Sequence, residues 1–419
     1  MFDLVPFLIL IVLAVLVVVV AGRLRFPYTI ALVGLGFLIG LAVVRFGYST
    51  LPPSIAALLT PPFFFDILLP PIVFEAAIHI DYRLLRGRLG IVLFLVVGGV
   101  LFTTLFTGVL VAYLFAIPLL AALLLASILS PTDPVAVIDL FRRLDVPAEL
   151  STIVESESLL NDAVGIIVFL VVLQLIVSGT ASPGLATIDF LKLSLIGVGV
   201  GALVAGGVYF LSNQLEDATA ETALSVVAAY GSYLLAVGLG GSGIVAAAIA
   251  GIAIGNFAVP RALRPAARQS LATFWKVIVY MANSVIFLTM GLLFALANLG
   301  SYLVLIAVVF GVILAGRAIF TYAHRPIARA IGGSSAVLPT SWYNVVALAG
   351  IRGAIPIVLA LSLLTVSTPL AKSTVDTIVA VTLGVAFVSI VFGNVTSEWY
   401  ARREFGERAP RADGSESLP

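Results

Sequence analysis

The chain has 419 residues, of which 61% are hydrophobic and only 10% charged, with a mean hydropathy of +1.21 and a formal net charge of +1. Soluble domains carry about 25% charged residues, so this composition excludes a soluble protein and predicts an all-α polytopic membrane protein. Nothing in the charge suggests nucleic acid as a partner. The sequence has no cysteine, which excludes disulfides and thiolate chemistry. His79 and His324 lack metal-site spacing, and we expect no cofactor.

Apolar windows of about 20 residues, the length of a helix that crosses a bilayer, predict about thirteen transmembrane helices. They lie near residues 3–22, 27–45, 60–79, 89–115, 118–140, 157–178, 187–212, 221–239, 243–259, 271–297, 301–323, 340–364 and 374–399. Sixteen Lys and Arg residues fall on one side of this arrangement and three on the other. Because basic loops stay in the cytoplasm, we predict the N-terminus outside and the C-terminus inside a multi-pass protein of the cell membrane, surrounded by lipid.

The third predicted span carries an acid among apolar residues, in the run Leu69-Pro-Pro-Ile-Val-Phe-Glu75. Ionisable residues inside a bilayer are costly and usually face the bundle interior. Glu75 has no basic residue beside it in the sequence. Two interpretations stay open, a carboxyl group that is protonated or hydrogen-bonded within the bundle, and a gating or auxiliary acid at a cavity.

The fifth span is interrupted by Ser130-Pro-Thr-Asp-Pro134. Pro131 and Pro134 each remove a backbone donor and obstruct the helix. Non-helical backbone at membrane depth is tolerated only inside protein or beside a water-filled cavity. One interpretation is a simple kink from which Asp133 reaches a loop. We favour a functional break that places Thr132 at a site, where Asp133 could also neutralise the N-terminal dipoles of half-helices.

The sixth span begins with the polar run Glu155-Ser-Glu-Ser-Leu-Leu-Asn-Asp162 and continues as an apolar helix. A carboxylate in mid-membrane costs roughly 2.5 to 3.5 kcal/mol on insertion scales, so such a residue is usually functional. Ser158 and Asp162 are four residues apart and share a helix face, as do Glu157 and Asn161. A hydroxyl one turn from a carboxylate suits a small cation or a proton.

In the tenth and eleventh spans we single out two polar side chains, Asn283 and Arg317. The amide of Asn283 either forms hydrogen bonds with exposed backbone groups or contributes to the packing between helices. A buried guanidinium requires an acidic partner, and we favour Glu157, with Arg352 as the competing partner for that acid. An Arg317 that reaches the lipid headgroups is the alternative.

The twelfth span contains Gly350-Ile-Arg-Gly-Ala-Ile-Pro356, where glycines and a proline surround a charge. Two interrupted spans in corresponding parts of a chain are typical of transporters, whose sites lie at the interface between inverted repeats. The sequence therefore predicts that the fifth and twelfth spans meet at a binding site.

Together these segments resemble the monovalent cation/proton antiporters of the sodium/hydrogen exchanger superfamily, in their electroneutral prokaryotic (NhaP-like) branch. The resemblance covers nearly the whole chain and rests on segments at Leu69–Ala76, Ser130–Ala136, Glu157–Gly165, Ser242–Ala246, Gly316–Ala318 and Gly350–Leu361, with Phe274, Trp275 and Asn283.

The resemblance implies thirteen helices in inverted repeats, with two broken helices that cross, and a homodimer. Residues 1–400 would form one transmembrane unit, in which core helices near 60–178 and 301–399 interleave with dimerisation helices. Residues 401–419 would be a short cytoplasmic tail.

The resemblance also implies roles for individual residues. Asp162 would bind either the cation or the proton, so that competition couples the two flows by alternating access. Asn161, where electrogenic relatives have a second aspartate, implies one sodium or lithium ion per proton. The other implied roles are Thr132 and Ser158 as sodium ligands with Asp162, Glu157 and Arg317 as a structural ion pair, and Glu75 as an acid near the cavity entrance.

Three alternatives stay open. A potassium/proton antiporter would use the same fold and ligand types. An intramembrane aspartyl hydrolase could pair Asp133 with Asp162. The helix-breaking prolines, Thr132 and Asn161 fit ion coordination better. An ion channel would pass current without obligatory proton counterflow.

Overall fold

A computed structural model of the chain describes residues 8, 11–17, 19, 23, 28–45, 62–133, 141, 144, 146–179, 182–215, 217–259, 265–296, 299–332, 337–364 and 366–405. Every regular element in these ranges is a helix. Eight described helices are long and apolar enough to cross a membrane, which confirms the predicted class of protein. The count of thirteen spans and their orientation stay predictions, since most of the span at 3–22 lies outside the described residues, as do Pro134 and residues 406–419.

The helices follow the predicted spans in order. The first half contains α2 (Tyr28–Arg45), η1 (Phe63–Leu68), α4 (Leu69–Ile78), α5 (Tyr82–Leu93), η2 (Phe94–Gly98), α6 (Gly99–Phe115), α7 (Leu119–Leu129), α9 (Ala148–Ser178) and α10 (Pro183–Ser212). The second half contains α11 (Ala218–Gly238), α12 (Gly243–Ala253), η3 (Ile254–Ala258), α14 (Pro265–Leu296), η4 (Leu299–Tyr302), α15 (Leu303–Gly332), α16 (Thr340–Leu348), α17 (Ala354–Ser362) and α18 (Lys372–Phe405).

Several helices extend beyond the apolar windows that predicted them. The helix α9 begins at Ala148 rather than near residue 157, and α18 continues to Phe405 rather than ending near 399. Their added turns are polar, so a hydropathy window does not detect them, although a helix can continue into the membrane interface.

Two glycine pairs let helices approach closely. In α2, Gly36 and Gly40 lie against the backbone of α14 at Leu288 and Leu292. In α10, Gly197 and Gly201 lie in the same way against α12. Any side chain at these positions would collide with the facing backbone, which is the reason small residues are favoured between membrane helices.

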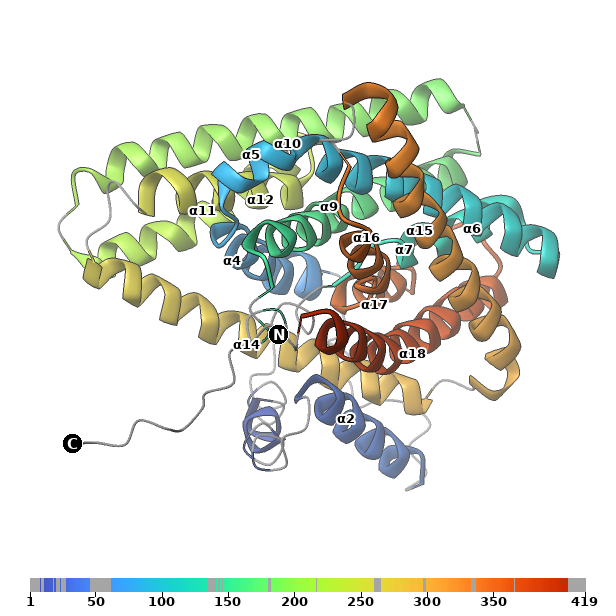
Figure 1. The fold of residues 1–419 in the computed structure, drawn as a ribbon. Coiled ribbons are helices and arrows are strands. Elements are labelled where there is room, and N and C mark those ends of the chain that lie inside the picture. The colour runs from blue at the N-terminus through green and yellow to red at the C-terminus, as the bar shows by residue number, and fades with distance from the viewer. Residues whose placement is uncertain are drawn as a thin grey trace, which may run out of the picture.

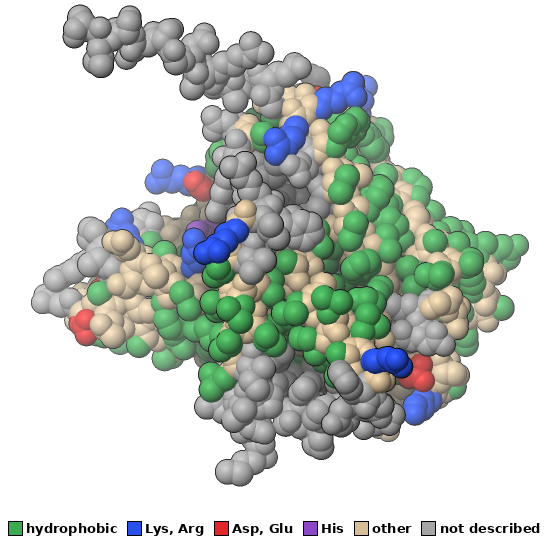
Figure 2. All heavy atoms as spheres, turned by 90° about the horizontal axis from the view of Figure 1, so that it is seen from below, with side chains coloured by type: hydrophobic (Ala, Val, Ile, Leu, Met, Phe, Trp, Pro, Cys, Tyr) green, Lys and Arg blue, Asp and Glu red, His purple; other side chains and the backbone are tan. Residues whose placement is uncertain are grey.

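The helix α9 lies at the centre of the molecule, with α7 and α17 beside it (Figure 1). Its side chains are buried on several faces, including the polar Ser156, Glu157, Ser158 and Asn161. The outside is apolar: Figure 2 shows hydrophobic side chains over most of one face, with Lys and Arg in separate clusters. On α10, Leu195, Leu203 and Phe210 are each about two-thirds exposed (68%, 70% and 66%), as expected of a helix that faces lipid.

Candidate functional site

The two interrupted spans cross beside α9. The helix α7 ends at Leu129, and residues 130–133 continue without helical structure. The span between α16 and α17 is likewise non-helical at 350–353. The backbone N–H of Asp133 donates to the carbonyl of Ile351 over 2.6 Å, which joins the two segments. The side chain of Asp133 lies against Gly353, where a Cβ would overlap with it. The predicted meeting of these two spans is therefore present in the structure.

Arg352 caps the ends of the broken helices. Its side chain is fully buried, at 0% exposure, and its Nε donates to the carbonyl of Leu129 over 3.2 Å. Its Nη1 donates to the carbonyl of Gly350, and its backbone N–H donates to Ser389 Oγ over 2.8 Å. Leu129 and Gly350 lie at the C-terminal ends of α7 and α16, which carry partial negative charge. Two carbonyls at the ends of the interrupted helices thus accept hydrogen bonds from one buried guanidinium.

Glu157 forms an ion pair with Arg317, the partner that the sequence favoured. Two parallel hydrogen bonds join the carboxylate to Arg317 Nη1 and Nη2, at 3.1 and 3.0 Å. Arg317 also donates from Nε and Nη2 to the carbonyl of Val346, at 3.2 and 2.8 Å. Gly350 lies so close to the Arg317 side chain that a Cβ would collide with it. A bidentate geometry with further backbone acceptors is what a buried pair requires.

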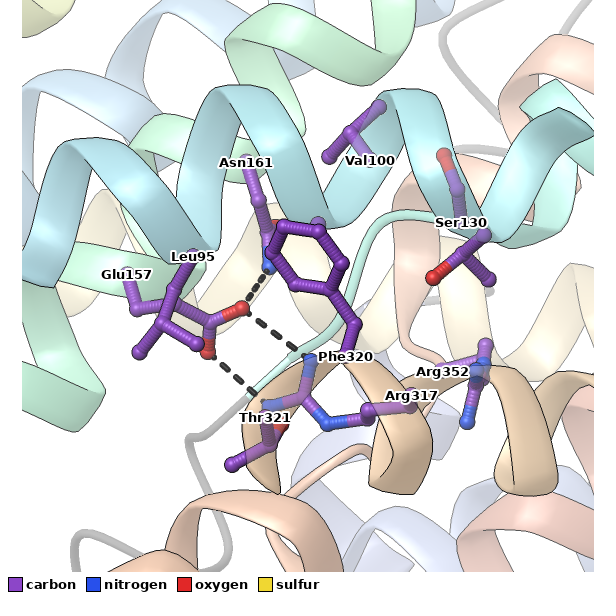
Figure 3. Close-up of a pocket in the computed structure, with 11 residues that line it drawn as sticks. Leu95, Val100, Ser130, Glu157, Asn161, Arg317, Phe320, Thr321 and Arg352 are labelled. Carbon is purple, nitrogen blue, oxygen red and sulfur yellow. Dashed lines mark hydrogen bonds and ion pairs between the residues drawn. The ribbon is translucent and has the colours of Figure 1, made fainter. Parts of the chain in front are cut away.

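Asn161 ties α9 to the first crossing segment. Its Nδ2 donates to Thr132 Oγ1 over 2.7 Å and to Glu157 Oε1 over 2.8 Å, while its Oδ1 accepts from the Thr132 backbone N–H over 3.2 Å. Figure 3 shows Asn161 and Arg317 converging on the carboxylate of Glu157. An amide supplies both donors and an acceptor here, whereas an ionised aspartate could only accept. Asn161 is therefore a structural bridge in this conformation.

A small polar cavity of about 20 Å³ lies beside this network (Figure 3). Its lining includes Ser130, Glu157, Asn161, Arg317 and Arg352. A space of this size and polarity can accommodate about one water molecule.

A much larger cavity, of about 440 Å³, adjoins the other face of α9. Asp162 and Ser158 line it together with Asp133, and Glu75 and Asn283 line it from α4 and α14. The remaining walls are largely apolar. The Glu75 side chain is 24% exposed at this cavity, and its carboxylate lies 3.6 Å from His79 Nδ1.

Thr132 does not line the large cavity in this structure. Its side chain is 2% exposed, its hydroxyl accepts from Asn161, and its carbonyl accepts a hydrogen bond from Ser158 Oγ. The structure thus brings Ser158 and Asp162 to the cavity, and connects Thr132 to it only through Ser158.

Three residues at this cavity were not predicted from the sequence, namely His79, Glu155 and Lys276. For two of them, the spacing in the sequence could have indicated their position. Glu155 precedes Asp162 by seven residues and Lys276 precedes Asn283 by seven, a spacing that returns to the same helix face after two turns. Lys276 lies near the start of the predicted span at 271–297, and the apolar pattern of that span did not connect it with the site.

An all-helical membrane protein whose two broken helices cross beside a carboxylate-lined cavity has the architecture of a secondary transporter. The family model "Sodium/hydrogen exchanger, transmembrane" matches residues 9–402. The chain belongs to this family of antiporters, and is a transporter rather than an enzyme.

Individual relatives agree with this assignment. The Na(+)/H(+) antiporter ApNhaP of Aphanothece halophytica is 32% identical over 94% of this chain and 73% of its own length. The Na(+)/H(+) antiporter NhaP of Pseudomonas aeruginosa is 28% identical over 93% and 94% of the two chains. The structure of the sodium proton antiporter MjNhaP1 from Methanocaldococcus jannaschii superposes with a TM-score of 0.80 at 23% identity, covering 96% of this chain and 98% of that one. That likeness establishes the fold.

Proposed function

We propose that the protein exchanges Na⁺ or Li⁺ for H⁺ across the cell membrane, one for one, by alternating access. The observation that carries this proposal is the opposite placement of two adjacent residues. Asp162 lines the 440 Å³ cavity beside Ser158, whereas Asn161 is bonded to Thr132 and Glu157. The relatives named as Na(+)/H(+) antiporters support sodium as the cation.

The ligands we propose are oxygens, which small hard cations prefer. Asp162 supplies a carboxylate and Ser158 a hydroxyl. The Thr132 carbonyl, already in contact with Ser158 Oγ, would complete the shell with water when that hydroxyl turns toward the ion. Asp133, Glu75 and Asn283 lie around the same cavity and would assist the approach of the cation.

One titratable carboxylate gives one-for-one exchange. Asp162 carries either a proton or a cation, so the two compete and their flows are coupled. Its neighbour Asn161 carries no proton to exchange, and Glu157 is held by Arg317. A charged carboxylate without a ligand would be costly to move through the membrane, so the core helices would cross only with Asp162 loaded.

The experiment is proton movement in proteoliposomes, followed with a pH-sensitive dye. Pulses of Na⁺ should release protons from acid-loaded vesicles, and Asp162→Asn should abolish this response while the purified variant keeps its thermal stability. Sodium-dependent proton movement that persists in Asp162→Asn would refute the assignment of this residue. Pulses of Li⁺ and K⁺ in the same vesicles separate a sodium/lithium exchanger from the alternative, a potassium/proton antiporter of the same fold.

Stoichiometry needs a separate measurement. One-for-one exchange moves no net charge, so an imposed valinomycin/potassium potential should leave the rate unchanged. A clear acceleration would contradict it, and a current without coupled proton flow would indicate a channel. We also propose that the protein is a homodimer, as its resemblance to the NhaP-like antiporters implies. Native mass spectrometry of the purified protein can check this.

A further inference from the structure

Two long helices each support one of the interrupted segments. The helix α9 packs beside α7 and its break, and α18 packs beside α16 and α17 and the break between them (Figure 1). On α9, Asn161 Oδ1 accepts a hydrogen bond from the backbone N–H of Thr132 over 3.2 Å. On α18, Ser389 Oγ accepts from the backbone N–H of Arg352 over 2.8 Å. Each long helix thus supplies a buried side-chain oxygen to one backbone donor of a break.

A second contact repeats at the same spacing. Four residues after the asparagine of α9, Gly165 lies so close to Pro131 that a Cβ would overlap with the proline ring. Four residues after the serine of α18, Gly393 lies in the same way against the side chain of Ile351. Residues four apart share a helix face, and both Pro131 and Ile351 directly precede the residue whose N–H is bonded. The two supports therefore match in position and in spacing.

The two supports differ at the next residue along each helix. Asp162 follows Asn161 and lines the large cavity, whereas Ile390 follows Ser389 and is buried. The support on α18 thus has an apolar side chain at the position that corresponds to the proposed ion-binding carboxylate. Its contacts with the break hold backbone in place, and they offer no charge to an ion.

The break that Ser389 supports holds the other break in turn. The Ile351 carbonyl accepts a hydrogen bond from the backbone N–H of Asp133 over 2.6 Å, and Arg352 Nε donates to the carbonyl of Leu129 over 3.2 Å. Asp133 lines the large cavity. A displacement of the second break would therefore carry over to the wall of the cavity through these two hydrogen bonds.

We propose that Ser389 is a positioning residue for the cation site, on which it acts through the second break. Its hydroxyl fixes the Arg352 backbone, and the adjacent Ile351 carbonyl fixes that of Asp133. The inference rests on the proposed exchange and names a residue that shapes its site without lining the large cavity. Ser389 is 1% exposed, so water cannot readily replace its hydroxyl as the acceptor.

The experiment compares wild type with Ser389→Ala by hydrogen–deuterium exchange of the purified protein. The substitution leaves the buried N–H of Arg352 without its acceptor, so the amides of 350–353 should exchange about fivefold faster or more. The amides of 130–133, which reach Ser389 only through the second break, should exchange faster as well. Ser389→Thr keeps the hydroxyl and should restore slow exchange in both segments. If Ser389→Ala does not fold, Ser389→Cys, with a weaker acceptor of similar size, takes its place.

Ser397→Ala is the matched control. Ser397 is a buried serine on the same helix, about two turns after Ser389, and its hydroxyl donates to the carbonyl of Leu348 over 3.2 Å. Its loss should cost a similar hydrogen bond and leave exchange at 130–133 unchanged. In proteoliposomes, Ser389→Ala should raise the KM for Na⁺ several-fold with a smaller change in kcat, whereas Ser397→Ala should leave the KM unchanged.

Faster exchange at 350–353 alone, or an unchanged KM for Na⁺, would overturn the proposal, because Ser389 would then support only its own break. Equal effects of Ser389→Ala and Ser397→Ala at 130–133 would overturn it too, since both would then report a general loosening of α18. The exchange measurement requires no transport. If wild type shows no sodium-driven proton movement, the proposed function fails, while faster exchange at both breaks would still establish that Ser389 positions them.

Discussion

On one face of α9, Glu157 and Asn161 are bonded to a guanidinium, a hydroxyl and a backbone N–H around a space of about 20 Å³. On the adjoining face, Ser158 and Asp162 line a cavity of about 440 Å³. The two regions lie within six residues of one helix, yet one is saturated with hydrogen bonds and the other is open. A transporter needs both, because a rigid support holds the site while the site itself exchanges its ligand.

Polar residues are dense in this part of α9 because its two faces have different tasks. Buried polar groups are costly unless every one is bonded. The bonded face, which carries Glu157 and Asn161, meets this condition with protein partners. On the cavity face, Ser158 donates to the Thr132 carbonyl, and the Asp162 carboxylate lines the cavity, where an ion or a proton can bind it. Substitutions on the bonded face should therefore reduce stability, and those on the cavity face should reduce transport.

The largest loss of stability is expected for Glu157→Gln. This change leaves Arg317 buried without a counter-charge, which typically costs about 3 to 5 kcal/mol. Thermal unfolding in detergent measures it. The double variant Glu157→Leu/Arg317→Met should recover much of the loss, because an apolar pair has no charge to compensate. A single variant as stable as wild type would show that the pair does not support the fold.

Asn161→Asp should cause the second-largest loss of stability. An ionised carboxylate cannot donate to Thr132 or Glu157 and repels the latter, so the loss should be about 1 to 3 kcal/mol for the unsatisfied groups. It should increase with rising pH, as the introduced carboxyl group ionises. The matched change Asn283→Asp places a carboxylate at the large cavity, where water can reach it, and should cost less. Equal losses at both positions would remove the distinction between the two faces.

Gly353→Ala tests the crossing of the broken segments. A Cβ at this position overlaps with the Asp133 side chain, and overpacking of this kind costs about 1 to 3 kcal/mol. Exchange activity should fall with it, since Asp133 lines the cavity. Gly90→Ala is the control, because its Cβ meets open space and alanine favours the helix. A Gly353→Ala variant with normal stability and transport would contradict the tight crossing.

Thr132→Val should have the smallest effect on stability, about 1 kcal/mol, through loss of the hydroxyl that Asn161 donates to. It removes the hydroxyl but keeps the carbonyl. If the carbonyl is the sodium ligand, the KM for Na⁺ stays near that of wild type, whereas a large increase in KM that Thr132→Ser reverses would identify the hydroxyl as the ligand.

Much of this site could be predicted because each feature is local. Prolines and glycines interrupt helices wherever they occur, so the broken segments at 130–133 and 350–353 were predictable. The pairing of Glu157 with Arg317 followed from the scarcity of buried charges, which leaves few possible partners. The position of Thr132 could not be predicted, because which of its oxygens faces the cavity depends on the neighbouring hydrogen bonds.

The sequence by itself determined the class of protein, the two broken spans and the carboxylate at Asp162, since hydropathy, proline chemistry and the cost of a charge in lipid act within single segments. Only the tertiary structure decided which residues share a cavity. Arg352 proved to cap the ends of α7 and α16, and Lys276 to share a cavity with Asp162, because both depend on how distant helices pack. Hydrogen bonds and Coulomb interactions act across space, whereas sequence spacing reports only neighbours along one helix.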